Sequence, residues 1–474
     1  MTRKTFFFVC IIWIGTGQAA EKQVIVDVNS ALGPFTLRIG TNGGPKGIIS
    51  NNDYTDLFHE LGFDRIRAHD YYGPVEWYRI FPNWEADPED PASYNFDSTD
   101  EIIQSIVNGG FDILYRIGPS WHDELVEYHN DPPGTIRDSQ GNILHEADST
   151  DFAKFASICK HIVMHYNEGW GNGYHYDIRK WEIWNEPFLA DRFWSGTPTQ
   201  FFMMFATVAK TLKSYDSSLE VGGPGLAGYV DDIYCDGLIS YCRDHQVPLD
   251  FFSWHSYGGR SQTPADYLTK GTGIRDRLDN YGFTETESIC DEWNAGINVA
   301  YFGDSGKGAA YYVSALTYFV EMGLEECYQY RGDDHPLGLV NPDDSLRIAA
   351  EALRAWQYLT KGTVRLQASG TDSLGFTVLA SISEARDTVW ILLSNFPDET
   401  QQVNLSVENL ATVNQDDWIM KRYVINQILR LVPVDSRSLP AHHPFSFIFP
   451  MQPESVHLLQ FTTKPASGID QTEH

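Results

Sequence analysis

Cysteine, basic residues and long apolar runs are all scarce in this sequence, and each shortage excludes a class of protein. Six cysteines in 474 residues are too few for a disulfide scaffold. The 34 basic residues are outnumbered by 64 acidic ones, and the resulting net charge of -30 disfavours binding to nucleic acid or to anionic membranes. No apolar run is long enough to span a bilayer as a helix. We therefore expect no nucleic-acid partner and no membrane insertion.

Signatures of metal and phosphate sites are missing as well. The 15 histidines form no H-E-x-x-H motif, and no cysteine or histidine pair has the spacing of zinc ligands. Residues 40–45 lack the G-x-G-x-x-G spacing of a dinucleotide-binding turn, and Lys307 is not followed by the Ser or Thr of a phosphate loop. We expect no catalytic metal and no cofactor.

The first 20 residues predict a signal peptide. A basic pair, Arg3 and Lys4, precedes an apolar run over residues 5–14, and the small residues at 17–20 form a cleavage site. We therefore expect a secreted or periplasmic protein.

Cleavage of that peptide would leave five cysteines. Cys235 and Cys242 stand seven positions apart, which on a straight helix is about 10 Å and too far for a disulfide. We predict that the five are buried free thiols.

From residue 34 to residue 362 the sequence alternates between strand-like and helix-like segments. Eight such alternations predict a closed parallel (β/α)₈ TIM barrel in the α/β class. The competing fold is an open doubly wound sheet, which would require a glycine-rich phosphate loop after its first strand. The predicted strands are 35–40, 65–69, 112–117, 180–187, 219–222, 249–257, 287–292 and 326–331.

After residue 362 the pattern changes to short strands without helices. Residues 363–463 predict an antiparallel β-sandwich domain, with strands near 375–382, 388–394, 401–407, 418–425 and 455–461. We expect the N-terminal segment 21–33 to join this sandwich as an extra strand. Residues 464–474 are polar and predict a disordered tail.

The segment 180–187, K-W-E-I-W-N-E-P, predicts an apolar strand that ends at an Asn-Glu-Pro corner. Strand alternation predicts that Glu182, Trp184 and Glu186 share one face, and proline ends the hydrogen-bonded run just after them. Glu186 should therefore lie at the C-terminal end of a barrel strand, where the active sites of such barrels are built.

A second glutamate ends the predicted strand 287–292. Alternation predicts that Ser288, Cys290 and Glu292 share a face. Two carboxyl groups on separate parallel strands are typical of glycoside hydrolysis, in which one protonates the leaving oxygen and the other attacks the sugar or activates water. The alternative for each glutamate is a solvated loop carboxylate.

Aromatic residues make up 14% of the chain, with 13 Trp and 25 Tyr, and many fall at predicted strand ends. Tyr and Trp offer flat apolar faces with a polar edge, which suits sugar rings, although most of them will simply fill the core. His255 and Tyr257 share one face of a predicted strand, as do Arg65, Arg67 and His69 of another.

Together these segments resemble the retaining glycosidases of the clan that contains glycoside hydrolase family 39, whose best-known members are β-xylosidases and α-L-iduronidases. The resemblance covers roughly residues 35–360. It rests on the motifs at 181–187, 254–257 and 291–293, and more specifically on 66–69, 94–97, 193–194 and 338–340.

The resemblance implies that Glu186 is the general acid/base, that Glu292 is the nucleophile and that Asn185 binds the sugar 2-hydroxyl. His255 and Tyr257 would reach the nucleophile or a substrate hydroxyl, unless they are an aromatic pair packed in the barrel mouth. The remaining candidates for substrate binding are His69 and two possible sugar platforms, Trp121 and Trp293.

Residues 330–335 depart from the pattern of the xylosidases. Arg331 could bind a carboxylated or sulfated sugar, or form a structural salt bridge. We expect a retaining exo-glycosidase that acts by double displacement on polysaccharide-derived oligosaccharides, with carboxyl groups about 5 Å apart, whereas about 8 Å would indicate inversion. The alternatives are a non-catalytic carbohydrate-binding protein, or an endo-acting glycosidase or transglycosylase on algal or bacterial polysaccharide.

Overall fold

The computed structural model describes most of the chain. The predicted signal peptide lies outside the described residues except for Ala20, and the predicted tail 464–474 lies wholly outside them. The described ranges are 20–121, 128–226, 233–258, 263–296, 302–410, 417–440 and 445–463.

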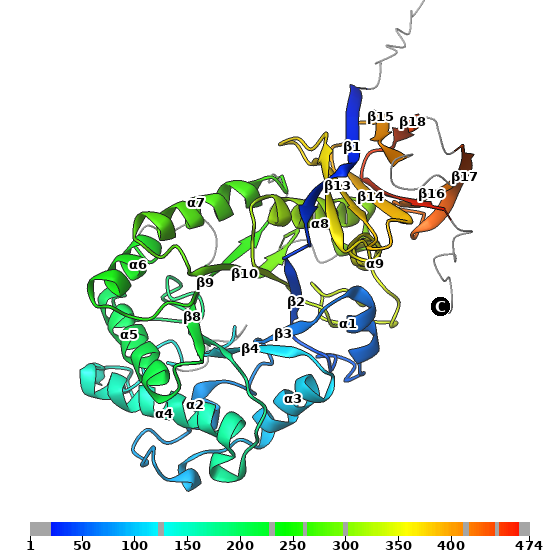
Figure 1. The fold of residues 1–474 in the computed structure, drawn as a ribbon. Coiled ribbons are helices and arrows are strands. Elements are labelled where there is room, and N and C mark those ends of the chain that lie inside the picture. Colours follow the sequence, from blue (N-terminus) through cyan, green and yellow to red (C-terminus); the bar gives the residue numbers. More distant parts are fainter. Residues whose placement is uncertain are drawn as a thin grey trace, which may run out of the picture.

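Eight parallel strands close into a barrel, as predicted (Figure 1). Each strand pairs with the next one along the chain, and the last pairs with the first, so the open doubly wound sheet is excluded. In order around the barrel they are β2 (Arg38–Asn42), β3 (Arg65–Ala68), β4 (Asp112–Ile117), β7 (Lys180–Ile183), β8 (Glu220–Leu226), β9 (Phe251–Tyr257), β10 (Glu287–Asn294) and β11 (Glu326–Gln329).

Helices surround the barrel and connect its strands (Figure 1). Their starts follow local capping chemistry: Asp148 and Thr197 each form a capping box at the start of a helix. The main helices are α1 (Thr55–Leu61), α3 (Asp97–Asn108), α4 (Ser149–Glu168), α5 (Pro198–Tyr215), α6 (Cys235–Asp244), α7 (Asp266–Asn280), α8 (Gly306–Glu321) and α9 (Ile348–Thr360). The short ones are α2 (Trp77–Ile80), η1 (Pro91–Ser93), η2 (Trp170–Asn172) and η3 (Phe302–Asp304).

The barrel interior is layered. Leu114, Phe251, Ile289 and Tyr328 form a separate apolar cluster across its middle. At the N-terminal end, the buried carboxylate of Glu326 forms ion pairs with three basic side chains, those of Arg38, Arg65 and Lys180. The C-terminal end is also polar, and there the buried charges belong to the candidate site described below.

A nine-stranded sheet follows the barrel. Its strand order is β17-β16-β19-β14-β13-β12-β1-β15-β18. The N-terminal strand joins it, as predicted: β1 lies between β12, to which it is antiparallel, and β15, to which it is parallel. The strands are β1 (Ala20–Gly33), β12 (Val364–Ser369), β13 (Phe376–Ile382), β14 (Thr388–Asn395), β15 (Gln401–Glu408), β16 (Trp418–Ile425), β17 (Val432–Leu439), β18 (Phe445–Met451) and β19 (Ser455–Thr462).

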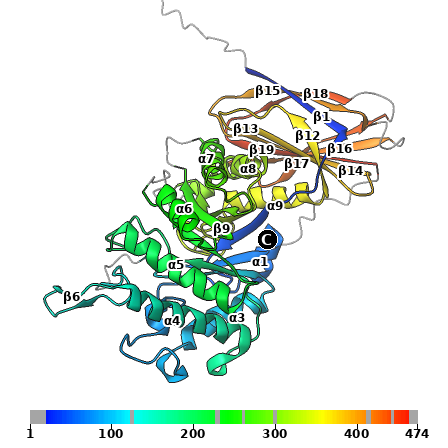
Figure 2. The ribbon, with the colours of Figure 1, turned by 60° about the vertical axis from the view of Figure 1, so that its left-hand side comes forward.

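The sheet folds over on itself, so that one continuous sheet makes both layers of the sandwich (Figure 2). Phe445 of β18 packs on Phe461 of β19 with ring centroids 5.0 Å apart, although five strands separate β18 and β19 in the sheet. The two edge strands of the sheet, β17 and β18, also meet: the guanidinium of Arg437 in β17 lies 3.9 Å from the centroid of the Phe447 ring in β18.

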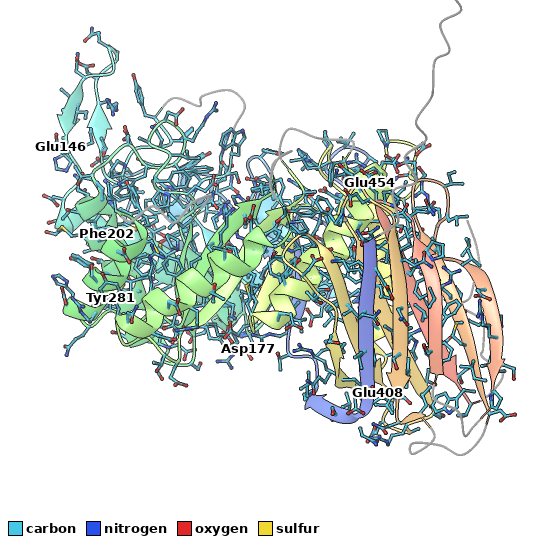
Figure 3. All side chains as sticks on the ribbon, turned by 90° about the horizontal axis from the view of Figure 1, so that it is seen from above. Glu146, Asp177, Phe202, Tyr281, Glu408 and Glu454 are labelled. Atoms are coloured by element: carbon cyan, nitrogen blue, oxygen red, sulfur yellow. The ribbon has the colours of Figure 1, made fainter. Side chains whose placement is uncertain are left out.

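The outer face of this sheet packs on α8 and α9 of the barrel (Figure 3). Ser314 Oγ of α8 donates to the carbonyl of Gly375 at 2.9 Å, and Ser394 Oγ of β14 donates to the carbonyl of Ala310 at 2.8 Å. Leu392 of β14 belongs to the same buried cluster as the barrel helices. The two modules therefore share a hydrophobic core.

Several local features were not predicted from the sequence. The strands β12, β17 and β18 were missed, and so was a hairpin of β5 (Ile136–Arg137) and β6 (Ile143–His145), which projects from the barrel near Glu146 (Figures 2 and 3).

The five cysteines among the described residues are free and buried, as predicted: Cys159, Cys235, Cys242, Cys290 and Cys327. A search of the described residues finds no helix whose length and apolar character would let it cross a bilayer.

Candidate active site

Glu186 and Glu292 meet at the C-terminal end of the barrel. Nδ1 of His255 lies 3.0 Å from Oε1 of Glu186 and 3.4 Å from Oε2 of Glu292. These two carboxylate oxygens therefore cannot be farther apart than the sum of the two distances. This upper bound admits the separation of about 5 Å that a retaining pair requires.

A β-bulge in β10 aims Glu292 into the barrel. Cys290 lies opposite Trp254 of β9 and Glu292 lies opposite His255, so Asp291 is an extra residue between two paired positions. Asp291 and Glu292 both contact Arg67 inside the barrel. The predicted shared face of Ser288, Cys290 and Glu292 is therefore wrong, because an extra residue reverses the alternation beyond it.

Glu186 follows a strand end that is equally irregular. The backbone φ angles of Trp184 and Glu186 are 78° and 43°, outside the range of a strand. Trp184 packs outward against Trp194 and Phe155, so the prediction that it shares a face with Glu186 is wrong. The Glu186 backbone N–H donates to the Gly225 carbonyl at 3.1 Å, which ties this corner to β8.

Arg67 of β3 is the hub of the site. It is fully buried, and its Nη1 donates to Oε1 of Glu292 at 2.7 Å. Its Nε donates to Glu182 at 2.7 Å, and its Nη2 lies 3.1 Å from Asp291. One guanidinium, which has only donors and keeps its charge, thus holds three carboxyl groups in place.

Arg67 also orients Asn185. Nη2 of Arg67 donates to Oδ1 of Asn185 at 2.7 Å. Because a guanidinium cannot accept a hydrogen bond, this contact identifies the oxygen end of the amide and leaves Nδ2 as the donor end. The Asn185 side chain is therefore a fixed donor beside Glu186, suited to a sugar hydroxyl.

The carboxyl group of Glu292 has donors on both oxygens. On Oε1 it has Arg67 and Nε2 of His69, which is 3.2 Å away. On Oε2 it accepts from the Tyr257 hydroxyl at 2.5 Å. Burial raises the pKa of Glu292 to about 7, with Glu186 adding to the rise, while His255 and Arg67 act against it.

His255 lies in an anionic environment. Burial alone would lower its pKa, but the carboxylates of Glu292 and Asp291 outweigh burial and raise it well above the ordinary value. Although burial acts in the opposite direction, Arg67 and His255 hold the pKa of Asp291 below its usual range. Burial raises the pKa of the neighbouring Glu182 to about 8. Asp291 is therefore an anion between the positive charges of Arg67 and His255.

The structure brings together six of the nine residues predicted for the site. Glu292 contacts His69, His255 and Tyr257, His255 contacts Glu186, and Asn185 is joined to them through Arg67.

Trp121 remains a candidate sugar platform. It is partly exposed, its backbone N–H donates to Asp70, and the Arg192 guanidinium lies 4.6 Å from its ring centroid. Asp70 in turn contacts Nε2 of His69 at 3.1 Å. Trp121 is thus connected to the site through Asp70.

Trp293 is not a sugar platform. Its side chain is fully buried and packs outward against Tyr267, Tyr312 and Phe319 of the surrounding helices. The physical reason is the bulge at Asp291: with Glu292 directed inward, the next side chain must point outward. No face of the indole ring is accessible to a ligand.

Arg331 does not face a substrate either. It is fully buried, its Nη2 donates to Oδ2 of Asp333 at 2.7 Å, and its Nη1 donates to the carbonyl of Asp70 at 2.8 Å. Its positive charge is therefore balanced by the carboxylate of Asp333, and of the two alternatives for Arg331 the structural salt bridge is the correct one.

Reasoning from sequence missed Arg67, Asp291, Glu182 and Arg116 as parts of the site. Arg116 of β4 is fully buried and donates from Nε to Nδ1 of His69 at 2.9 Å. The available signal was a charged residue at an inward position inside an otherwise apolar strand, because such a charge is stable only with a partner.

One group among the described residues has a donor set that could hold a cation: His145, Asp148 and Asp151, outside the barrel. Asp148 and Asp151 already form the capping box of α4, and His145 lies 2.7 Å from Asp151. Helix capping accounts for this cluster.

Comparison with known proteins identifies relatives of this chain. The sequence profile of Glycosyl hydrolases family 39 matches residues 22–272, more than half of the chain. A β-xylosidase of Caldicellulosiruptor saccharolyticus is 30% identical over 204 residues, and one of Geobacillus stearothermophilus is 27% identical over 232 residues. These matches cover 42% and 47% of this chain but only 37% and 42% of the relatives, less than half of their length.

A solved structure extends the likeness to nearly the whole chain. The structure of a glucosidase from Croceicoccus marinus superimposes with a TM-score of 0.76 at 26% identity, covering 93% of this chain and 99% of that one.

Proposed function

The chain belongs to glycosyl hydrolases family 39, and we propose that it is a retaining exo-glycosidase that releases sugars from polysaccharide-derived oligosaccharides by double displacement. One observation carries the proposal: Nδ1 of His255 contacts the carboxyl groups of both Glu186 and Glu292. Two carboxyl groups that share one nitrogen are close enough for one of them to attack a sugar carbon directly, without a water between.

In the first step, Glu186 donates its proton to the glycosidic oxygen as the bond to the anomeric carbon breaks, and the bonding electrons leave with that oxygen. A carboxylate oxygen of Glu292 attacks the same carbon and forms a glycosyl ester. The Nδ2 donor of Asn185 is placed to bind the 2-hydroxyl, where hydrogen bonds strengthen as positive charge grows.

In the second step, Glu186, now a carboxylate, takes a proton from water. The water oxygen attacks the anomeric carbon, and the ester bond returns its electrons to Glu292. Donors from Arg67, His69 and Tyr257 stabilise the carboxylate that is released. One water is consumed, and two inversions retain the anomeric configuration.

For the substrate we propose uncharged β-linked sugars, with β-xylosides and β-glucosides first. The relatives named as β-xylosidases and a glucosidase support this choice. The burial of Arg331 against Asp333 removes the basic residue that had suggested a carboxylated or sulfated substrate.

We also propose that the protein is secreted or periplasmic. Residues 1–20 support this part of the proposal through their basic start, apolar run and small-residue cleavage site. Expression of the full chain followed by N-terminal sequencing of the exported protein should give a mature start near residue 20 or 21.

The activity is tested with a panel of aryl glycosides, with the product anomer followed by NMR. We expect hydrolysis of the β-xyloside or β-glucoside with retention. Glu186→Ala and Glu292→Ala should each lose at least a hundredfold in rate. Azide, a small anion, should rescue both variants by occupying the space of the missing carboxyl group, which lies on a different face of the sugar in each. In Glu186→Ala the product should be the β-glycosyl azide. In Glu292→Ala it should be the α-glycosyl azide.

Glu351→Ala is the matched control, because Glu351 is also a buried, ion-paired glutamate but lies on α9. It should keep wild-type rates. Binding of oligosaccharides without turnover would identify a carbohydrate-binding protein and end the proposal. An inverted product would contradict the retaining mechanism, and lengthened products would identify a transglycosylase.

A further inference from the structure

Two buried histidines flank the proposed nucleophile, one on each carboxylate oxygen. His69 Nε2 lies 3.2 Å from Oε1 of Glu292, and His255 Nδ1 lies 3.4 Å from Oε2. Each imidazole could be a neutral donor or a cation, and the difference is a full charge beside the reacting carboxyl group. The groups on the far side of each ring decide between these states.

The far side of His69 faces Arg116. Nε of Arg116 donates to Nδ1 of His69 at 2.9 Å. A guanidinium N–H can only donate, so Nδ1 must offer a lone pair and the ring proton must sit on Nε2, which faces both Glu292 and Asp70. Burial, with Arg67 and Arg116 nearby, lowers the pKa of His69 well below its ordinary value. His69 is therefore neutral in a single tautomer.

The far side of His255 faces Asp291. Nε2 of His255 lies 3.3 Å from Oδ2 of Asp291, while Nδ1 faces the carboxyl groups of Glu186 and Glu292. Both ring nitrogens thus face acidic oxygens, and the negative charge of Asp291 and Glu292 favours the doubly protonated imidazolium.

We propose that Arg116 and Asp291 are positioning residues that hold the two histidines beside the nucleophile in opposite charge states, His69 neutral and His255 cationic. The inference rests on the proposed function, in which Glu292 attacks a carbon that gains positive charge. A neutral His69 donates a hydrogen bond without adding positive charge there, while the His255 cation offsets the negative charge that Glu186 acquires in the first step.

Other charged groups also act on the two rings. Those facing His69 are Arg67, Asp70, Arg116, His255, Glu292 and Arg331. Those facing His255 are His69, Glu186, Asp291 and Glu292. Of these, Arg116 and Asp291 are the ones that approach the ring nitrogens turned away from the carboxyl groups of the proposed catalytic pair.

The charge states can be read directly, without substrate. Ring ¹⁵N NMR of the full chain labelled at histidine distinguishes the imidazolium from each neutral tautomer, and His69→Gln and His255→Gln assign the two signals. At pH 7 we expect His69 to be neutral with its proton on Nε2 and His255 to be protonated on both nitrogens. The same charge state for both rings would overturn the proposal.

Asp291→Asn removes the charge that holds His255. In this variant His255 should lose its proton at lower pH. Its signal should become that of a neutral ring at pH 7, and the alkaline limit of kcat/KM should fall by at least about one pH unit. Asp100→Asn is the matched control, because Asp100 pairs at 3.0 Å with the buried His165 away from the site. It should shift neither the pH profile nor the His255 signal.

Arg116→Met removes the donor to His69 and its charge. We expect His69 to lose its single tautomer and to titrate between pH 5 and 8, and kcat to fall about tenfold with little change in KM. Arg422→Met is the control, since Arg422 lies 3.4 Å from the buried His457 in the sheet domain.

An Asp291→Asn or Arg116→Met variant with slower turnover but unchanged ring signals and pH profile would show a merely structural role and overturn the proposal. Failure of the proposed function itself would look different: the wild-type protein would then turn over no glycoside, whatever its histidine signals. Should a variant not fold, the wild-type spectrum alone still decides the charge states.

Discussion

The charge on Glu292 is set by opposing forces around one side chain. Burial favours the protonated form, whereas the donors on both oxygens favour the carboxylate, and the pKa is raised to about 7. The charge of His255 opposes the rise most strongly, followed by that of Arg67, whose Nη1 donates to Oε1 at 2.7 Å. A nucleophile whose pKa lies near neutrality is ionised only above that pH.

We therefore predict that activity is lost on the acid side well above the ordinary pKa of a glutamate. Glu292 must be a carboxylate to attack, so kcat/KM should fall as pH decreases through about 7. Removing the Tyr257 hydroxyl, which donates to Oε2 at 2.5 Å, should move this limit to still higher pH, because that bond favours the charged form.

The measurement is kcat/KM from pH 4 to pH 9 for the wild type and Tyr257→Phe. Tyr312→Phe serves as the control, since Tyr312 is also a buried, hydrogen-bonded tyrosine but lies on α8 behind the barrel. A wild-type acid limit near pH 4.5 would contradict the prediction.

At the scale of elements, irregular strand ends build the site. The bulge in β10 turns both Asp291 and Glu292 inward, and the corner after β7 brings Glu186 next to them. The end of β8 supports that corner through Gly225, whose carbonyl accepts from the Glu186 backbone. Bulges next to active sites commonly redirect a side chain in this way.

Gly225 leads to a prediction about this support. Its φ is +62°, and a Cβ there would lie 3.0 Å from His255 Nε2, 3.1 Å from Asn185 Oδ1 and 3.3 Å from Arg67 Nη2. We expect Gly225→Ala to lower kcat/KM about tenfold, because displacements of a few tenths of an ångström in these side chains disturb the reacting geometry.

Gly323→Ala separates that effect from backbone strain. Gly323 has a similar φ of +72°, but a Cβ there would contact nothing within 4 Å. Both variants should lose about 1–2 kcal/mol of stability from the left-handed backbone. Enzyme kinetics and urea denaturation of the two variants decide the matter, and equal losses of activity would contradict the prediction.

For the whole molecule, the barrel and the sheet are joined by a common core. Helices α8 and α9 carry buried residues that pack on the sheet, and β1, from the opposite end of the chain, is an interior strand of that sheet, between β12 and β15. Damage to the sheet core should therefore destabilise the barrel and its active site as well.

Adjacent residues of β1 test this coupling. Val26 is fully buried in the sheet core, whereas Ile25 is 42% exposed. Val26→Thr keeps the shape but buries a hydroxyl, at a cost of roughly 1–3 kcal/mol. Ile25→Thr should change stability by less than about 0.5 kcal/mol.

Thermal denaturation followed by circular dichroism and by residual activity provides the measurement. In Val26→Thr we expect both transitions to move down together, and in Ile25→Thr we expect neither to move. A sheet transition that shifts while the activity transition stays in place would show that the two modules unfold independently.

The sequence by itself determined the order of strands and helices, the closed barrel, the sheet domain with its N-terminal strand, and the position of Glu186 and Glu292 at strand ends. These properties follow from local patterns: apolar periodicity, caps and turn residues act within about ten residues of the chain. Most elements could therefore be predicted from their own segments, whereas β5, β6, β12, β17 and β18 were missed.

Only the tertiary structure decided which way several side chains point. An extra residue at Asp291 and the irregular corner at Trp184 reverse the expected faces, and both depend on pairing with neighbouring strands. For the same reason Trp293 is buried outside the barrel. Arg331 is buried because its guanidinium donates both to Asp333 and to the carbonyl of Asp70, which follows β3. A strand's side chains change face with each one-residue shift, so facing depends on register, which is a property of the assembled sheet.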